Sequence, residues 1–249
     1  PAIFATTRKY GTVLENIVMD QDGIPDFHDT SKTQNTRGSY PIEFIENRTH
    51  DSKGGHPQNV IFLTCDAFGV LPPISRLTPE QAAYHFISGY TAKVAGTEVG
   101  VKEPQATFSA CFGEPFMPMH PGVYADLLSD KMNQHNANAW LINTGWSGGP
   151  YGVGNRMKIR YTRAMLNAAL DGELDDVEYV LDQRFGFEVP LECPGVPSEV
   201  LQPIQTWDDS DNYNQTADNL AKMFIENFTR YQGGVSDAVN SATPTVIGN

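Results

Sequence analysis

The sequence predicts a mixed α/β fold, because strand-like and helix-like segments alternate through the middle of the chain. An apolar run of strand length at 59–64 is followed by amphipathic segments at 82–94 and 122–136, and a second apolar run stands at 139–143. Strand, helix, helix and strand in this order are typical of a sheet covered by helices. We expect strand 59–64 to be buried on both faces.

The bulk composition is that of an ordinary globular chain and excludes several classes of protein. With 249 residues, of which 40% are hydrophobic, the chain is long enough to bury a full core. No run of 18 apolar residues occurs, so we expect no membrane span or membrane partner. The formal net charge of −13 opposes a nucleic-acid partner, because the summed field repels phosphates. A small anionic ligand is compatible with this charge if cations gather in one cleft.

The cysteines and the first ten residues both favour a cytoplasmic protein. The three cysteines, Cys65, Cys111 and Cys193, are widely spaced and form no zinc-binding pattern, so we expect reduced, mostly buried thiols and no metal ligands. Residues 1–10 contain no basic-then-apolar signal region.

Two charged residues near the start of the chain leave alternatives open. Glu15 lies among the apolar positions of a strand-like segment at 11–19, either as a solvated edge carboxylate or as a charge directed into a cleft. Arg37 ends a polar loop just before a second strand-like segment at 40–45. It is either a solvated surface charge or a bidentate clamp for an anion, which the planar guanidinium suits.

The helices are predicted from their start signals and apolar faces. Thr78, Pro79 and Gln81 make a capping box with proline in the first turn, followed by a helix body at 82–94 in which Gly89 is a weak point. The second helix, 122–136, should turn one apolar face to the core. That face consists of Val123, Leu127, Leu128 and Met132.

The last third of the chain predicts a helix at 162–170, a strand at 178–181 and a final helix at 214–232. Gly172 is a suitable residue to follow the first of these helices. We expect residues 1–235 to form one α/β domain and the small-residue segment 236–249 to be a flexible tail.

The segment 143–163 combines glycines, aromatic residues and cations between a strand and a helix. It contains Gly145, Gly148, Gly149, Gly152, Gly154, Arg156, Lys158, Arg160 and Arg163. Such a loop is either a phosphate or nucleotide site, because glycine lets the backbone approach a ligand, or a long surface loop. Neither G-x-x-x-x-G-K-[ST] nor G-x-G-x-x-G occurs in the chain, so no complete phosphate-binding motif supports the first interpretation.

Several motifs together resemble the ATP-dependent phosphoenolpyruvate carboxykinase family. The most specific is VIFLTCDAFGVLPPISRLT at 60–78. Others follow in the family's order: VLENI (13–17), NTRGSYP (35–41), YTAKVAGTE (90–98), FSACFG (108–113) and NTGW (143–146). The resemblance extends over nearly the whole chain.

The resemblance implies the later part of the family's C-terminal mononucleotide-binding domain, a mixed-sheet α/β domain truncated here at its N-terminus. Family members convert oxaloacetate and ATP to phosphoenolpyruvate, CO2 and ADP in gluconeogenesis, with Mg and Mn assisting. The phosphate-binding loop and the Mn ligands of the family precede the position of Pro1. We therefore expect the missing N-terminal portion of the parent enzyme as a partner, and weak ATP binding at best by this segment alone.

The resemblance also implies roles for five residues. Arg37 matches an arginine that contacts the transferred phosphoryl group and the substrate, and Glu15 matches a nucleotide-contacting carboxylate. Arg156 and Met157 match a pair beside the adenine, although many bacterial members have Ile at the second position. Thr162 matches a further nucleotide contact.

Three hypotheses follow from these observations. The chain is part of an ATP-dependent carboxykinase that supplies the adenine wall and a phosphoryl-contacting arginine, and it is inactive alone. Alternatively, it is a stand-alone, non-catalytic module that binds a nucleotide or an anion. In the third and weakest hypothesis, it is purely structural, and its arginines are surface charges.

Overall fold

The computed structural model describes residues 2–32, 36–94, 101 and 103–248. They divide into two compact units, the first made of 1–56 and 93–103 and the second of 57–92 and 104–249. The predicted single domain over 1–235 includes the whole first unit and most of the second, and it stays a prediction.

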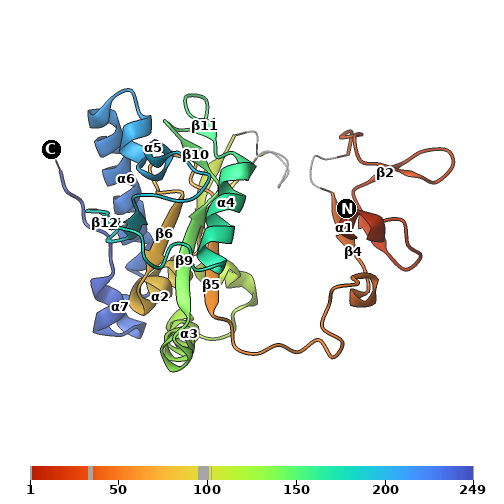
Figure 1. The fold of residues 1–249 in the computed structure, drawn as a ribbon, viewed down its shortest axis with the longest axis horizontal. Helices are drawn as coiled ribbons and strands as arrows, with labels where there is room; N and C mark the ends of the chain where they lie inside the picture. Colours follow the sequence, from red (N-terminus) through yellow and green to blue (C-terminus); the bar gives the residue numbers. More distant parts are fainter. Residues whose placement is uncertain (1, 33–35, 95–100, 102, 249) are drawn as a thin grey trace. The chain divides into compact units, whose positions relative to one another are not determined.

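The second unit is built on a mixed five-stranded sheet, as the sequence predicts (Figure 1). Its strands, in spatial order, are β12 (Tyr179–Leu181), β13 (Glu188–Pro190), β6 (Ile74–Leu77), β9 (Asn138–Asn143) and β5 (Asn59–Thr64). β5 and β9 are parallel, and the other neighbouring pairs are antiparallel. The two apolar runs of the sequence are thus neighbouring strands.

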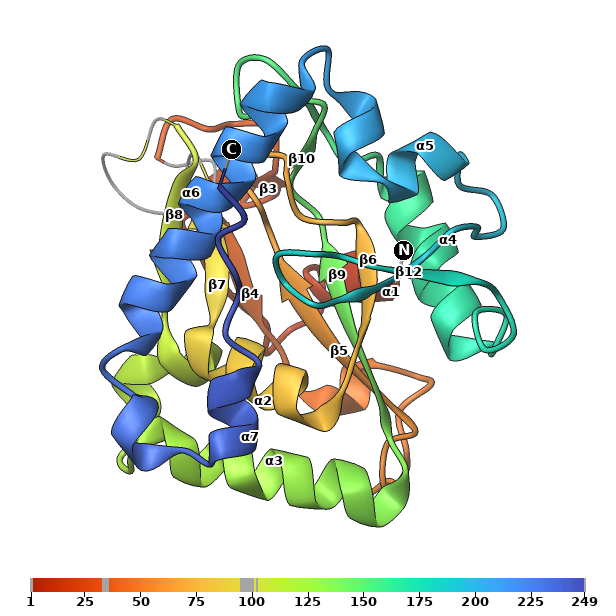
Figure 2. The ribbon, with the colours of Figure 1, turned by 90° about the vertical axis from the view of Figure 1, so that its left-hand side faces the viewer.

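Helices cover both faces of this sheet (Figure 2). They are α2 (Pro79–Ser88), α3 (Pro121–His135), α4 (Ile159–Leu170), α5 (Ser198–Leu201), α6 (Ser210–Phe228) and α7 (Asp237–Ser241). Side chains alternate along β9, so that Leu141 joins the core cluster of α2, α3 and α6, whereas Trp140 joins the cluster of α4. β9 is therefore the centre of two hydrophobic cores.

Helix α2 begins as predicted but ends earlier. The Thr78 hydroxyl accepts from the backbone N–H of Gln81, and the Gln81 side chain accepts from the N–H of Thr78, which confirms the capping box. The predicted continuation to residue 94 is wrong, because Gly89 takes a left-handed conformation with φ of 52°. The chain then enters strand β7 (Tyr90–Lys93), which pairs with β8 (Gln105–Phe108).

Two predictions about burial are also wrong. Strand β5 is not buried on both faces: it lies at the edge of the described sheet, and Leu63 is 60% exposed. On α3, Val123 and Leu127 are exposed, whereas Met132 is buried. The apolar face of this helix is therefore only partly turned to the core, to which Ala125, Leu128 and Met132 contribute.

The first unit contains α1 (Ala2–Thr6), β1 (Val13–Glu15), β2 (Val18–Met19), β3 (Pro25–Asp26) and β4 (Arg37–Ser39). The strand predicted over 11–19 is broken at Asn16, whose φ is 61°. Residues Ile42–Phe44 form a 3-10 turn instead of a strand, after a proline that has no N–H to donate to a ladder. Among the described residues of this unit, only Thr6 and Ile17 are buried.

The C-terminal segment contributes to the second unit. Helix α7 contacts α2, and Val239 is 3% exposed. The backbone N–H groups of Ile247 and Gly248 donate to the carboxylate of Asp218, which also forms a short ion pair with Arg184. The flexibility of 236–249 stays a prediction, although most of its described residues have defined contacts.

Two further observations concern the cysteines and the helices. All three cysteines are free and buried. No helix within the described ranges is long and apolar enough to cross a membrane.

Buried His85 makes the stability of the chain depend on pH. It lies on α2 among Tyr84, Phe187 and Phe224, with ring centroids 4.9 to 5.5 Å away. Burial lowers the pKa of His85 from an ordinary value of 6.5 to about 3. Below pH 6.5, His85 is protonated in the unfolded chain but stays neutral in the folded chain. The free energy of unfolding therefore decreases as the pH falls below that value.

We expect this effect to cost about 2 kcal/mol at pH 5 relative to pH 8. The measurement is urea unfolding of the wild type and of His85→Leu at both pH values. The variant should lose less stability on acidification by about that amount. Equal losses in the two proteins would contradict the assignment.

Candidate functional site

The candidate site lies where two parallel strands end side by side. In the β5–β9 pair, the last residues Thr64 and Asn143 are register partners. The loops that follow, 65–73 and 144–157, therefore leave the sheet at the same edge. Ligands of open α/β sheets bind outside the carboxyl ends of the strands.

The glycine-rich loop is packed on the loop that follows β5. The N–H of Trp146 donates to the carbonyl of Asp66 over 2.8 Å, and that of Tyr151 donates to the carbonyl of Ala67 over 3.1 Å. A Cβ on Gly69 would collide with the carbonyl of Gly149, and one on Gly145 would collide with the backbone of Asp66. These glycines thus permit the close approach of two loops.

The guanidinium of Arg156 lies over an aromatic ring. Strands β10 (Trp146–Ser147) and β11 (Asn155–Arg156) pair so that Trp146 lies opposite Arg156. The guanidinium carbon is 5.0 Å from the centroid of the Trp146 ring, and Nε donates to the carbonyl of Thr144 over 2.9 Å. Because Arg156 is exposed, a second planar group has access to its other face.

Met157 can contact a ligand through its backbone rather than through its side chain. Its side chain is buried, and its N–H donates to the carbonyl of Gly145 over 2.7 Å. With the N–H already used, the backbone group that Met157 can offer to a ligand is its carbonyl, an acceptor.

A cavity of about 560 Å³ opens beside these two residues. Arg156, Met157, Lys158 and Tyr161 line it, together with Ser147, Gly148, Asn155, Pro197, Glu199, Val200 and Thr206. Its volume lies in the ordinary range for small-molecule sites. Thr162, in the first turn of α4, is half-buried and does not line this cavity.

The other two predicted site residues form a pair in the first unit. Glu15 and Arg37 are direct partners across the antiparallel pair β1–β4, and both are exposed. This pairing could not be predicted from local patterns, because 21 residues separate the two strands in the chain.

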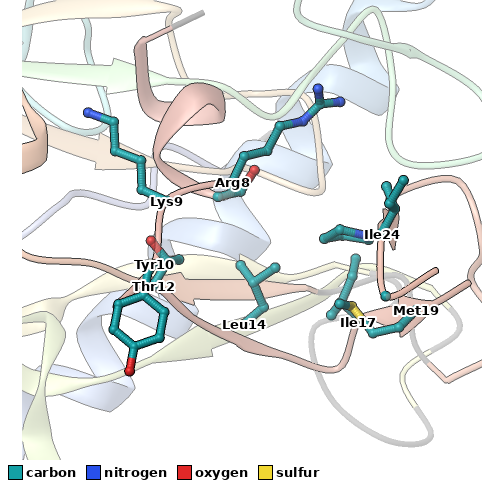
Figure 3. A pocket seen from close by; sticks show the side chains of 11 residues that line it. Arg8, Lys9, Tyr10, Thr12, Leu14, Ile17, Met19 and Ile24 are labelled. Atoms are coloured by element: carbon teal, nitrogen blue, oxygen red, sulfur yellow. The ribbon is translucent and has the colours of Figure 1, made fainter.

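A larger cavity, of about 950 Å³, lies in the first unit but includes neither Glu15 nor Arg37 (Figure 3). Leu14, Ile17, Met19 and Ile24 contribute apolar side chains to it, and Arg8 and Lys9 contribute cations. Of its lining residues only Ile17 is buried, and none of them carries a carboxylate.

No group of three or more His, Cys, Asp or Glu side chains that could hold a metal ion occurs in the part of the chain that the structure describes. The described residues thus do not fit a metal centre of their own.

The structure adds two residues to the site that sequence reasoning did not select, Asp66 and Asn143. Both are fully buried and stand at or just after the ends of the apolar strands. A polar residue at the carboxyl end of a buried strand was the signal that could have identified them.

Comparison with known proteins agrees with the resemblance carried by the sequence motifs. The family model described as phosphoenolpyruvate carboxykinase matches residues 1–199. A protein named phosphoenolpyruvate carboxykinase (ATP) from Geobacter metallireducens is 58% identical over 240 residues, which are 96% of this chain and 45% of that protein. Proteins of the same name from Brucella suis and Geotalea uraniireducens are 55% and 59% identical, over 99% and 96% of this chain and 46% and 45% of their own lengths.

The chain thus spans less than half the length of these curated relatives. The family model nevertheless covers most of the chain, and it includes both Arg37 and the segment 143–163. On this match, together with the mixed sheet, the chain belongs to the phosphoenolpyruvate carboxykinase family.

Proposed function

We propose that this chain is the nucleotide-binding part of an ATP-dependent phosphoenolpyruvate carboxykinase. The reaction is the conversion of oxaloacetate and ATP to phosphoenolpyruvate, CO2 and ADP. Support comes from the relatives, which carry "(ATP)" in their names. The single observation that carries the proposal is the stack of Arg156 on Trp146, with its outer face exposed beside a cavity of about 560 Å³.

In this proposal, the adenine ring stacks on the exposed face of Arg156. A guanidinium between two aromatic planes gains cation–π attraction on both sides. The Met157 carbonyl accepts a hydrogen bond from the amino group of adenine, since the N–H of Met157 is already donated to Gly145. Guanine presents a carbonyl oxygen at the corresponding position, and two acceptors repel each other, so the site should prefer ATP to GTP.

The phosphoryl contact falls to Arg37 in this proposal, and the basis is the resemblance. Phosphoryl transfer needs fixed cations on the equatorial oxygens, and Arg offers two parallel donors for them. Glu15 and Thr162 are proposed as further nucleotide contacts on the same basis.

Divalent cations enter the proposal only through the family. Mg and Mn would neutralise charge on the phosphates when bound. The family resemblance places the ligands of these cations in the part of the enzyme that precedes Pro1. The same part would supply the triphosphate site, and we propose that the complete enzyme works in the cytoplasm, in gluconeogenesis.

The adenine wall is tested by Arg156→Ala in the full-length polypeptide that contains this chain. We expect ATP affinity to fall about tenfold, in keeping with the loss of one stacked cation. Affinity for inorganic tripolyphosphate, which has no base, should not change. Isothermal titration calorimetry measures both.

Arg160→Ala is the matched control, because Arg160 is an exposed cation four residues further on, in helix α4, and it lies over the ring of Tyr161 instead. It should bind ATP like the wild type. Equal ATP affinity in Arg156→Ala and the wild type would refute the adenine assignment.

The phosphoryl contact is tested by Arg37→Ala, again in the full-length polypeptide. Removing a cation that acts on the transferred group should lower kcat at least about a hundredfold, while ATP affinity stays within about threefold. Arg48→Ala, which removes a half-buried arginine of the first unit that donates to the carbonyl of Thr49, should leave kcat unchanged. An Arg37→Ala enzyme with wild-type turnover would remove Arg37 from the mechanism.

A further inference from the structure

Asp66 is a fully buried carboxylate, and within the described ranges it has no cationic partner. No described Lys or Arg forms an ion pair with it. An isolated buried charge is costly, so hydrogen bonds must compensate for its lost hydration.

The compensation comes from four donors. Oδ1 accepts from the N–H of Phe68 over 2.9 Å and from the hydroxyl of Tyr90 over 2.9 Å. Oδ2 accepts from the N–H of Val70 over 2.7 Å and from that of Leu71 over 2.9 Å. Burial raises the pKa of the Asp66 carboxyl, and these hydrogen bonds oppose the rise. The carboxylate thereby fixes the backbone of the loop 66–71.

Asn143 ties the same loop to the end of β9. Its Oδ1 accepts from the N–H of Asp66 over 3.0 Å and from that of Gly145 over 2.8 Å, and its Nδ2 donates to the carbonyl of Leu71 over 2.9 Å. One buried amide thus connects the loop after β5 with the first residues of the glycine-rich loop.

From there, short links lead to the base-binding residues. The carbonyl of Asp66 accepts from the N–H of Trp146, and the Trp146 ring lies under the guanidinium of Arg156. The carbonyl of Gly145 accepts from the N–H of Met157. Arg156 and Met157 therefore rest on residues that are held by the loop that Asp66 organises.

We propose that Asp66 is a positioning residue for the nucleotide base: by fixing the loop 66–71, it sets the position of Trp146 and hence of Arg156 and Met157. The inference rests on the proposed function, since it assigns a role in the same nucleotide site. Asp66 itself does not touch the nucleotide. A purely fold-stabilising role is the alternative, and the two differ in whether base binding changes in protein that is still folded.

The test is Asp66→Asn in the full-length polypeptide. The substitution keeps the size of the side chain but replaces one oxygen, an acceptor for two groups, with an NH2 donor. Displacing a binding group by about 1 Å is enough to cost between tenfold and a hundredfold in activity. We expect KM and Kd for ATP to rise by at least about tenfold, with kcat at saturating ATP within about threefold and tripolyphosphate affinity unchanged. The preference for ATP over GTP should shrink in parallel.

Asp182→Asn is the matched control. Asp182 also organises a loop, because its Oδ1 accepts from the N–H groups of Arg184 and Phe185, and burial also raises its pKa. It has no hydrogen bond to the glycine-rich loop. This variant should lower Tm while ATP affinity and base preference stay as in the wild type.

If Asp66→Asn does not fold, Tyr90→Phe decides, because it removes one donor and leaves the carboxylate with its three backbone N–H groups. We then expect ATP affinity to fall about threefold with tripolyphosphate affinity unchanged. Wild-type ATP affinity and base preference in a folded Asp66→Asn, or in Tyr90→Phe if the first variant is unfolded, would overturn the proposal. If ATP affinity is normal in the Asp66 variant but reduced in Arg156→Ala, only the positioning role of Asp66 is refuted. If ATP affinity is normal in both variants, the proposed adenine site itself is refuted.

Discussion

The parallel pairing of β5 with β9 is the constraint on which the rest of the candidate site depends. Because the strands run in the same direction with Thr64 opposite Asn143, their carboxyl ends meet, and both following loops must pack on each other. That packing needs polar groups to satisfy the strand ends, and Asp66 and Asn143 supply them from fully buried positions. It also needs backbones to approach closely, which explains Gly69 and Gly145 without reference to a phosphate.

The charge distribution shows why an acidic chain is compatible with an anionic ligand. The net charge is −13, yet Arg156, Lys158, Arg160 and Arg163 lie within eight residues, and no acidic residue occurs between 155 and 170. Two of these cations, Arg156 and Lys158, line the cavity together with one carboxylate, Glu199, whereas distant negative charges are screened by salt. Only Arg156 is fixed by Trp146 and Thr144; the cations of Lys158 and Arg160 stack on Tyr161.

The sequence predicted the parts that depend on local chemistry and failed where tertiary contacts decide. The capping box of Thr78 and Gln81, the strands at 59–64 and 139–143 and the α/β class were predictable from side-chain types and periodicity, whereas the mixed sheet was implied by the family resemblance. The end of α2 at Gly89 was not, because that glycine also accommodates the backbone at Ser109. The pairing of Glu15 with Arg37 depends on strand register, and the support of Arg156 by Trp146 depends on a hairpin, neither of which apolar periodicity encodes. The proposed nucleotide and phosphoryl contacts of Glu15, Arg37 and Arg156 rest on the family resemblance.

The central claim, that the loop after β9 holds the base of ATP, is tested most directly by amide hydrogen exchange of the full-length polypeptide. Exchange is measured without ligand, with ATP and with inorganic tripolyphosphate. We expect ATP to slow exchange within 144–158, where the N–H groups of Trp146 and Met157 hold the loop in place, and tripolyphosphate to leave it unchanged. ATP binding that leaves exchange in 144–158 unchanged would contradict this claim.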